Sequence, residues 1–240
     1  MEIEGKRVLV SGAGRGLGFA LVALLAEGGA REVIAGTRNP HAREVLTALG
    51  RNVTPVQLDV TSDEDVAAVA QMGTMDILIN NAGFAGFGNP LTMSFDDVVK
   101  EVSVNYLGVL RLTRAIAPGM IAQGDGVIVS IATAFAKVNL PLVGSYCATK
   151  AGLYSLGQAM RAYLSDYGVR VITVLPTTID TDMSSGADVP KMTKEFAAAE
   201  ILAAIHAEAH DPPIGEEAKS ILDSFAKDPL GLEKMLMKYK

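Results

Sequence analysis

Two residues in the segment GSYCATKAG, Tyr146 and Lys150, could carry acid–base chemistry. A spacing of four places both side chains on one face of a helix. A phenol has an unperturbed pKa of about 10, and a lysine cation about 5 Å away, at an effective dielectric constant of about 20, would lower that pKa by about two units. The pair predicts a tyrosine that exchanges protons near neutral pH, although a half-buried tyrosine beside a surface lysine would give the same pattern.

A second group of residues could bind phosphate. The turn SGAGRGLG at 11–18 follows an apolar strand-like run and precedes an apolar helical pattern. Gly12, Gly16 and Gly18 would let backbone amides approach a diphosphate at a helix N-terminus, where the helix dipole favours negative charge. A P-loop is disfavoured because no Gly-Lys-Ser/Thr follows. The turn predicts a dinucleotide phosphate site, and glycines that serve only the turn geometry are the alternative.

Arginines near this turn indicate which dinucleotide would bind. The second expected strand ends in AGTRNP, where a dinucleotide fold contacts the adenosine ribose. An acidic side chain there would repel a 2′-phosphate, whereas an arginine binds it. Thr37 and Arg38 stand at this point, and Arg15 could add a second positive charge. The sequence therefore favours NADP(H) over NAD(H), with solvated surface arginines as the alternative.

The elements that must position these residues alternate between short apolar runs and helix-length patterns, which is typical of an α/β domain with a parallel sheet. The expected strands are Arg7–Val10, Val33–Gly36, Val53–Leu58, Ile77–Asn80, Val127–Ile131 and Val169–Leu175. The expected helices are Leu17–Gly28, His41–Leu49, Ser62–Ala70, Ser94–Gln123 (broken into two) and Tyr146–Tyr167. We expect a Rossmann-like, doubly wound sheet of six or seven strands with helices on both faces.

Residues 190–240 contain no convincing strand and predict a helical tail of the same domain, so that 1–240 form a single domain. Breaks are expected near Asp211-Pro212-Pro213 and Asp228-Pro229. The segments EFAAAEILAAI and KSILDSFAKDPLGLEKML have apolar stripes at helical spacing. The tail could cover a substrate cleft, pack against a second subunit in a homodimer, or pack on the edge of its own sheet.

Composition excludes several other classes. Lysine and arginine number 21 against 27 aspartates and glutamates, a net charge of −6, and the basic residues are scattered, which argues against nucleic-acid binding. Cys147 is the single cysteine and the three histidines are dispersed, so no disulfide or metal site is expected. The N-terminus lacks signal-peptide features, and the longest apolar run, 19–26, is too short for a membrane span. We expect a cytoplasmic protein.

Over about residues 5–182 these motifs resemble the short-chain dehydrogenase/reductase family, and the NADP-dependent carbonyl reductases within it. The glycine turn is similar to that family's TGxxxGxG with Ser11 in the Thr position, Asn80-Asn81-Ala82-Gly83 is similar to its NNAG, and Tyr146 and Lys150 match its YxxxK. Asn105 and Asp59-Val60 match its helix asparagine and its adenine-contacting pair. Two departures stand out: Thr133 replaces the usual serine, with Ser130 as a competitor, and Thr177 replaces the glycine of Pro-Gly. The seventh strand, with its DGG ending, is missing.

The resemblance implies a set of site residues. The catalytic residues would be Asn105, Thr133, Tyr146 and Lys150. The cofactor would contact Gly12, Arg15, Gly16, Leu17, Gly18, Thr37, Arg38, Asp59, Val60, Asn81, Ala82, Gly83, Tyr146, Lys150, Pro176, Thr177, Ile179 and Thr181. The substrate would contact Thr133, Phe135, Val138, Leu140, Val143, Tyr146, Thr177 and Met183, unless these residues pack in the core.

The implied activity is NADPH-dependent reduction of an aldehyde or ketone by hydride transfer. Tyr146 would act as the general acid, Thr133 would hydrogen-bond the substrate oxygen, Lys150 would hold the nicotinamide ribose, and Asn105 would fix a water. The mostly apolar lining suits a neutral or hydrophobic carbonyl. The alternatives are an NAD-linked alcohol dehydrogenase, a 3-oxoacyl reductase, and a non-catalytic NADPH-binding sensor or scaffold.

Overall fold

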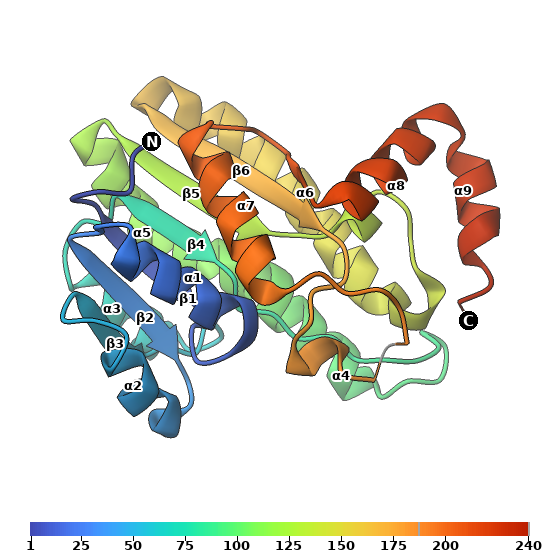
Figure 1. The fold of residues 1–240 in the computed structure, drawn as a ribbon, viewed down its shortest axis with the longest axis horizontal. Helices are drawn as coiled ribbons and strands as arrows, with labels where there is room; N and C mark the ends of the chain where they lie inside the picture. Colours follow the sequence, from blue (N-terminus) through green and yellow to red (C-terminus); the bar gives the residue numbers. More distant parts are fainter. Residues whose placement is uncertain (187, 240) are drawn as a thin grey trace.

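A computed structural model describes residues 1–186 and 188–239 and places a seven-stranded, parallel sheet at the centre of the chain (Figure 1). The strand order is β3-β2-β1-β4-β5-β6-β7. The strands are β1 (Arg7–Ser11), β2 (Glu32–Thr37), β3 (Val53–Gln57), β4 (Ile77–Asn80), β5 (Gly126–Ile131), β6 (Val169–Pro176) and β7 (Pro213–Ile214). Each of the six expected strands is present within one residue at either end, which confirms the doubly wound fold.

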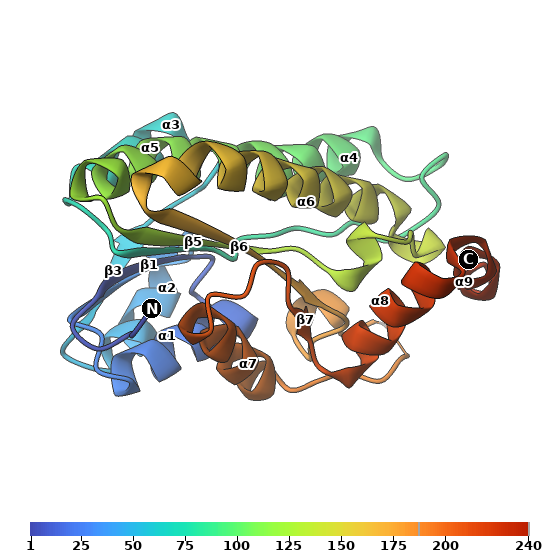
Figure 2. The same ribbon diagram turned by 90° about the horizontal axis from the view of Figure 1, so that it is seen from above.

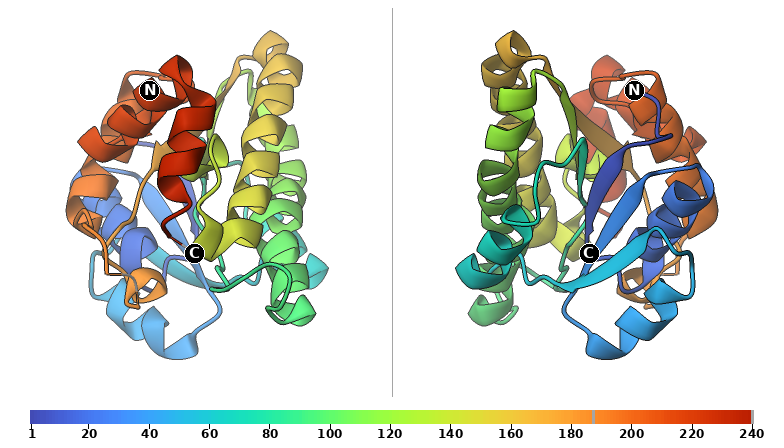
Figure 3. Two further views of the ribbon diagram at one scale, coloured as in Figure 1. Left: turned by 90° about the vertical axis from the view of Figure 1, so that its right-hand side faces the viewer. Right: turned by 90° about the vertical axis from the view of Figure 1, so that its left-hand side faces the viewer.

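Nine α-helices of the described residues surround the sheet: α1 (Gly16–Glu27), α2 (Pro40–Thr47), α3 (Asp63–Ala70), α4 (Phe95–Val102), α5 (Val109–Gln123), α6 (Gly144–Leu164), α7 (Lys194–His206), α8 (Glu216–Lys227) and α9 (Pro229–Leu236). Figure 2 shows α3, α4, α5 and α6 on one face, and α1, α2 and α7 on the other. The end-on views in Figure 3 show the sheet between these two layers. Among the described residues, no helix combines the length and apolar character needed to cross a membrane.

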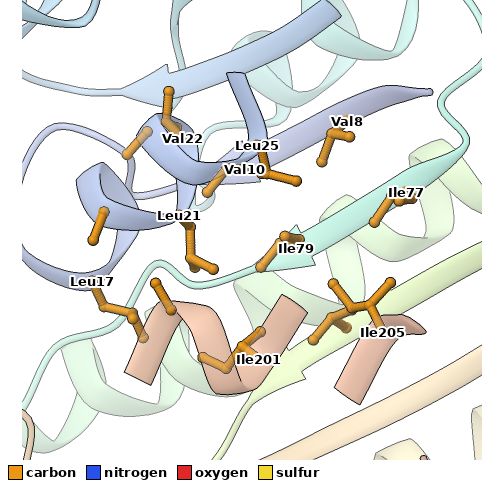
Figure 4. Packing of buried hydrophobic residues seen from close by; sticks show 14 of the residues in the cluster. Val8, Val10, Leu17, Leu21, Val22, Leu25, Ile77, Ile79, Ile201 and Ile205 are labelled. Atoms are coloured by element: carbon orange, nitrogen blue, oxygen red, sulfur yellow. The ribbon is translucent and has the colours of Figure 1, made fainter. Parts of the chain in front are cut away.

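Alternate residues of each strand enter different cores because successive side chains point to opposite faces of a sheet. Val8 and Val10 of β1 lie in the core under α1 and α7, together with Leu21 and Ile201 (Figure 4). Leu9 lies between them in sequence and packs in the core on the other face. The sheet is thus buried on both sides, and its position relative to the helices is fixed by two apolar layers.

One expectation about the fold was wrong, and another gains detail. The long helical stretch is divided into two α-helices, α4 and α5, as expected, and a π-helical segment, Ser103–Gly108, joins them without a break in the helical chain. A seventh strand does exist: β7 pairs with the end of β6, with Leu175 beside Pro213 and Pro176 beside Ile214. It was missed because two residues give no periodicity, and because Pro213 has no N–H and is tolerated only at a sheet edge.

The C-terminal tail is otherwise helical, as expected, and its helices end at the two proline-containing breaks. α7 packs against α1 through Ile201 and Ile205, which are fully buried (Figure 4). Leu232 and Leu236 of α9 pack on the chain's own segment that precedes α6, at Val138. The tail therefore covers both a face of the sheet and the approach to Tyr146.

Candidate active site

The glycine turn lies at the carboxyl end of β1, beside β4, where the chain changes direction across the sheet. Gly12 has φ +68°, and a Cβ on it would lie 2.8 Å from the Cα of Ala82. A Cβ on Gly18 would lie 2.3 Å from the carbonyl oxygen of Gly12. Side chains at either position would push the turn away from the chain after β4. Both glycines are therefore required by close backbone approach.

Hydrogen bonds hold the chain after β4 against this turn. Asn81 Nδ2 donates to the carbonyl oxygens of Ser11, at 3.0 Å, and Gly12, at 3.2 Å. The hydroxyl of Ser11 accepts the backbone N–H groups of Asn81 and Ala82, both at 3.1 Å. A threonine hydroxyl at position 11 could accept the same two hydrogen bonds. These contacts bring Asn81, Ala82 and Gly83 to the mouth of the glycine turn.

The N-terminus of α1 is well suited to an anion. Its N-cap, Arg15, makes no side-chain capping bond, and the first turn contains no acidic residue. The backbone N–H groups and the positive end of the helix dipole are thus directed to the turn, with Leu17 and Gly18 buried beneath. Arg15 itself forms an exposed ion pair with Asp182 at 2.9 Å. A cavity of about 470 Å³ opens here between the turn and the segment after β6.

The end of β2 places Arg38 at the surface and Thr37 inside. The Thr37 hydroxyl is buried and accepts the N–H of Asn39 at 3.2 Å. Arg38 is 63% exposed and reaches Asp59 at 3.4 Å. Burial would raise the pKa of Asp59, but hydrogen bonds from Thr61 and the Arg38 guanidinium together hold it below its ordinary value. Val60 is buried behind this pair.

Tyr146 and Lys150 lie one turn apart on α6, as their spacing predicts. The ammonium of Lys150 lies 5.6 Å from the centre of the Tyr146 ring and donates to the carbonyl oxygen of Ile131 at 2.6 Å. Lys150 is 4% exposed, and this burial lowers its pKa to about 8. The hydrogen bond to the end of β5 fixes the lysine beneath the tyrosine.

The pKa of Tyr146 moves in the direction opposite to the one that its spacing from Lys150 predicts. Burial raises the pKa of the phenol above its ordinary value, and the neighbouring Cys147 and Glu101 raise it further. Desolvation disfavours the phenolate, and the spacing of two residues in a sequence does not reveal desolvation. In the structure the phenol is therefore held in its protonated form.

Asn105 connects the π-helical segment to α6 and to the chain after β4. Its side-chain oxygen accepts the N–H of Phe84 at 2.9 Å, and its amide donates to the Phe84 carbonyl oxygen at 2.8 Å. The amide also donates to the Thr149 hydroxyl at 3.0 Å, which donates in turn to the carbonyl oxygen of Tyr146 at 2.7 Å. Asn105 thus ties the tyrosine's helix to the loop at the glycine turn.

Two residues that make these contacts, Thr149 and Phe84, were not predicted from the sequence. Thr149 lies within the Tyr-x-x-x-Lys segment, and only its position three residues after Tyr146 hints at a helical hydrogen bond back to that residue. Phe84 contributes through its backbone, so its residue type carries no signal. Both partners become visible only in three dimensions.

Thr133 and Ser130 occupy different environments. The Thr133 hydroxyl follows the end of β5, donates to the carbonyl oxygen of Pro176 at 3.0 Å and accepts the N–H of Phe135 at 3.3 Å. Ser130 lies within β5, fully buried and paired in register with Asn80 and Thr173 of the neighbouring strands. Ser130 therefore lies inside the sheet, whereas the Thr133 hydroxyl lies beyond the carboxyl end of β5, where Lys150 bonds Ile131.

The segment after β6 closes the other side of this region. Thr177 is 7% exposed, and its hydroxyl has no partner among the residues that the structure describes. Ile179 pairs with Met192, which folds the segment back on itself. Thr181 lies over the glycine turn, since a Cβ on Gly16 would lie 3.1 Å from its Cγ2. Met183 is exposed and would lie 3.8 Å from a Cβ on Gly83.

The expected substrate contacts divide into two groups. Val138 is buried with Leu232 and Leu236, so it faces the tail rather than a cleft, which corresponds to the core-packing alternative. Phe135 and Leu140 pack on the same cluster but stay partly exposed. Val143, Thr177 and Met183 lie elsewhere, at the start of α6 and after β6. The tail therefore supports one wall of the candidate cleft from behind.

Comparison with known proteins agrees with this geometry. The family model described as short chain dehydrogenase matches residues 6–190. The chain is 32% identical over 202 residues to the 3-oxoacyl-(acyl-carrier-protein) reductase FabG of Vibrio cholerae, covering 82% of this chain and 83% of that protein. It is 35% identical over 185 residues to the D-erythrulose reductase of Gallus gallus, covering 76% and 75%.

Among solved structures, a short chain dehydrogenase from Burkholderia cenocepacia in complex with NADP has a TM-score of 0.93 and 37% identity, covering 98% of this chain and 99% of the other. The similarity includes the C-terminal tail, which the family model does not reach. The family model, the curated relatives and the solved structure thus agree over most of the chain. The chain belongs to the short-chain dehydrogenase family and is an NAD(P)-dependent oxidoreductase acting on CH–OH and C=O groups.

Proposed function

We propose that this enzyme reduces a neutral, largely apolar aldehyde or ketone with NADPH, and that Tyr146 is the general acid. The observation that carries the proposal is the convergence of Tyr146, Lys150 and Thr133 at the carboxyl ends of β5 and β6, opposite an uncapped helix N-terminus. The close approach at Gly12 and Gly18 fits a bound dinucleotide, because the backbone there leaves no side chain between the amides and a diphosphate.

The nicotinamide supplies the hydride. Tyr146 would donate its phenolic proton, which it carries at neutral pH, to the developing alkoxide. Thr133 would hydrogen-bond the same oxygen once its hydroxyl proton turns from the Pro176 carbonyl oxygen to the substrate, so that two donors stabilise the charge as it forms. Lys150 would hold the nicotinamide ribose, and Asn105, which holds Phe84 in place, would fix a water near the tyrosine's helix.

NADPH preference rests on Arg38 and on the absence of an acidic residue at Thr37. Arg38 is largely exposed, and among the described residues its guanidinium has a single polar partner, Asp59 at 3.4 Å, so it could turn to a 2′-phosphate. Each charge-assisted hydrogen bond is worth about 1.5–3 kcal/mol, or about ten- to hundredfold in affinity. The NADP in the Burkholderia relative supports the same preference.

The cofactor prediction is tested by the double variant Thr37→Asp, Arg38→Leu. It is expected to lower kcat/KM for NADPH by about ten- to hundredfold and to change the value for NADH far less, because one substitution adds repulsion and the other removes a donor. Arg51→Leu, on an exposed turn before β3, is the matched control and should change neither value. Equal or better wild-type kcat/KM with NADH would contradict the assignment of Arg38.

A 3-oxoacyl thioester is the second candidate substrate, because the Vibrio cholerae relative is a 3-oxoacyl reductase. A screen of aldehydes, diketones, ketosteroids and 3-oxoacyl thioesters, with NADPH consumption followed by absorbance, separates these classes. Tight NADPH binding without consumption in the presence of any carbonyl would instead support a sensor or scaffold. The reverse assay, with alcohols and NAD⁺, tests an oxidative enzyme.

The tail is expected to support the substrate wall. Leu232 is 4% exposed and packs on Val138, so Leu232→Ala should cost about 2–5 kcal/mol of stability and loosen the segment that leads to Tyr146. We expect a several-fold rise in KM for the carbonyl and an unchanged KM for NADPH. Leu230→Ala, at a largely exposed position of the same helix, is the control. An unchanged carbonyl KM in a destabilised Leu232→Ala protein would limit the tail to a structural role.

A further inference from the structure

Glu101 is an acidic residue in an unexpected place. It is fully buried, whereas Phe95, Val99 and Val102 of the same short helix, α4, are exposed. A charged side chain is rarely buried unless it is paired and hydrogen-bonded. An inward-facing carboxylate beside outward-facing apolar residues reverses the ordinary pattern of an amphipathic helix. Glu101 therefore needs an explanation beyond the packing of α4.

One oxygen of this carboxylate holds the loop after β4. Glu101 Oε1 accepts the N–H of Gly86 at 2.7 Å, a length typical of a charge-assisted bond. One turn later, Asn105 binds the N–H and the carbonyl oxygen of Phe84. Glu101 and Asn105, on one side of a continuous helix, thus fix two residues, Gly86 and Phe84, of the loop after β4. The other oxygen, Oε2, is buried and has no donor among the described residues.

The side of the helix that carries Glu101 packs toward the start of α6. Asn105 contacts Thr149, and Tyr106 lies against Gly152, where a Cβ would be 3.4 Å from its ring. From the first pair to the second, the residue number rises on both helices, so the two helices run parallel where they touch. The position four residues before Asn105 then lies beside the start of α6, where Tyr146 is. α4 does pack on α6, and the Glu101 charge contributes to the raised pKa of Tyr146.

We propose that Glu101 is a positioning residue for carbonyl reduction: it fixes the loop after β4 through Gly86 and places a carboxylate beside the start of α6, where Tyr146 lies. The inference rests on the proposed function, since only reduction needs the proton on the phenol before the reaction begins. A carboxylate near the phenol also opposes the Lys150 ammonium on the other side, so the two charges together set when the tyrosine loses its proton.

Among the other groups around Tyr146, Cys147 of α6 acts in the same direction as Glu101, but it is a buried thiol and stays unchanged in the variants below. Lys150, also on α6, has the opposite sign. Lys137, from the segment before α6, lies 3.6 Å from the Tyr154 ring, and Lys100 of α4 lies 4.0 Å from the Phe84 ring. Asp182, after β6, is paired with Arg15. Glu101 is thus the carboxylate packed between α4, α6 and the loop.

Glu101→Gln removes the charge and keeps the shape and an oxygen that can accept the Gly86 N–H. Removing a negative charge makes the phenolate easier to form, so the pKa of Tyr146 falls. The alkaline limb of kcat/KM for reduction should move to lower pH by about 0.5–1 unit. The acid limb for alcohol oxidation, which needs the phenolate, should move by the same amount. Asp97→Asn, one turn earlier on α4, removes the same charge farther from Tyr146 and should move neither limb.

Glu101→Asp separates the two roles. It keeps the charge but shortens the reach to Gly86, so we expect an unshifted pH profile and a several-fold higher KM for the cofactor. The phenol is also titrated directly, by ultraviolet difference absorbance of wild type and Glu101→Gln, each against its Tyr146→Phe counterpart with oxidised cofactor bound. A lower phenol pKa in Glu101→Gln supports the proposal even if no carbonyl is reduced, which would refute only the proposed function. Unchanged pH limbs and an unchanged phenol titration, or an equal shift in Asp97→Asn, overturn it.

Discussion

Tyr146→Phe is expected to lower kcat/KM for NADPH-dependent carbonyl reduction by about 10²–10⁴-fold, because it removes the proton donor and leaves the ring in place. The backbone contacts that hold this part of α6 do not involve the phenol: Thr149 bonds the Tyr146 carbonyl oxygen, and Lys150 bonds Ile131. The fold should therefore survive, and the cofactor should still bind. Single-turnover rates measured together with cofactor titrations separate the loss of chemistry from a loss of binding.

Tyr163→Phe is the matched control for this experiment. Tyr163 lies on the same helix, is 79% exposed, and loses the same hydroxyl without contact to the site. Its kcat/KM should equal that of the wild type. If Tyr146→Phe keeps most of the wild-type rate with a substrate that the wild type reduces, Tyr146 is not the general acid, and another donor must be sought near Thr133.

The second large effect is expected at Thr133, where the hydroxyl and the methyl group can be tested separately. Thr133→Ser keeps the hydroxyl and should stay active, whereas Thr133→Val keeps the shape and should lose about 10²–10³-fold in kcat, the usual cost of one missing donor at a developing oxyanion. The hydroxyl also bonds Pro176 and Phe135, so valine leaves two buried backbone groups unpaired. A stability loss of about 1–3 kcal/mol is expected alongside.

Thermal unfolding and kcat must therefore be measured on the same Thr133 variants, well below the unfolding temperature. Ser130→Ala is the control for the competing hydroxyl. Ser130 is fully buried within β5, so its removal should leave kcat nearly unchanged. An active Thr133→Val protein together with an inactive Ser130→Ala protein would show that the roles of the two hydroxyls are the reverse of those proposed.

The sequence predicted the sheet well because its strands are apolar almost throughout and are separated by helix-length patterns. Val127–Ile131 is an example: it was expected as a buried strand, and β5 is buried over its whole length. The π-helical segment could not be predicted, since a shift from i→i+4 to i→i+5 bonding leaves no mark on residue types. β7 could not be predicted either, because its pairing with β6 depends on where the turn before it ends.

The site was predictable where a residue type has a geometric consequence. Gly12 and Gly18 are examples, because only a missing side chain permits their contacts. The electrostatics were not predictable. The Arg15–Asp182 pair joins residues 167 positions apart, and the buried Glu101 lies on a helix whose pattern predicts a solvated acid. Charge interactions depend on burial and on distance in space, and the spacing of residues along the sequence predicts neither.

The π-helical segment between α4 and α5 sets the directions in which the side chains of the two helices point. A turn of π-helix accommodates one residue more than an α-helical turn, and one residue corresponds to a rotation of about 100°. Relative to α5, the side chains of α4 therefore point in a different direction from the one they would have if the whole stretch were a regular α-helix. α4 can direct Glu101 to the active site while α5 directs Leu112 and Ile116 into the core. Deleting one residue from 103–108 would leave both halves helical yet turn one of them away from its partners.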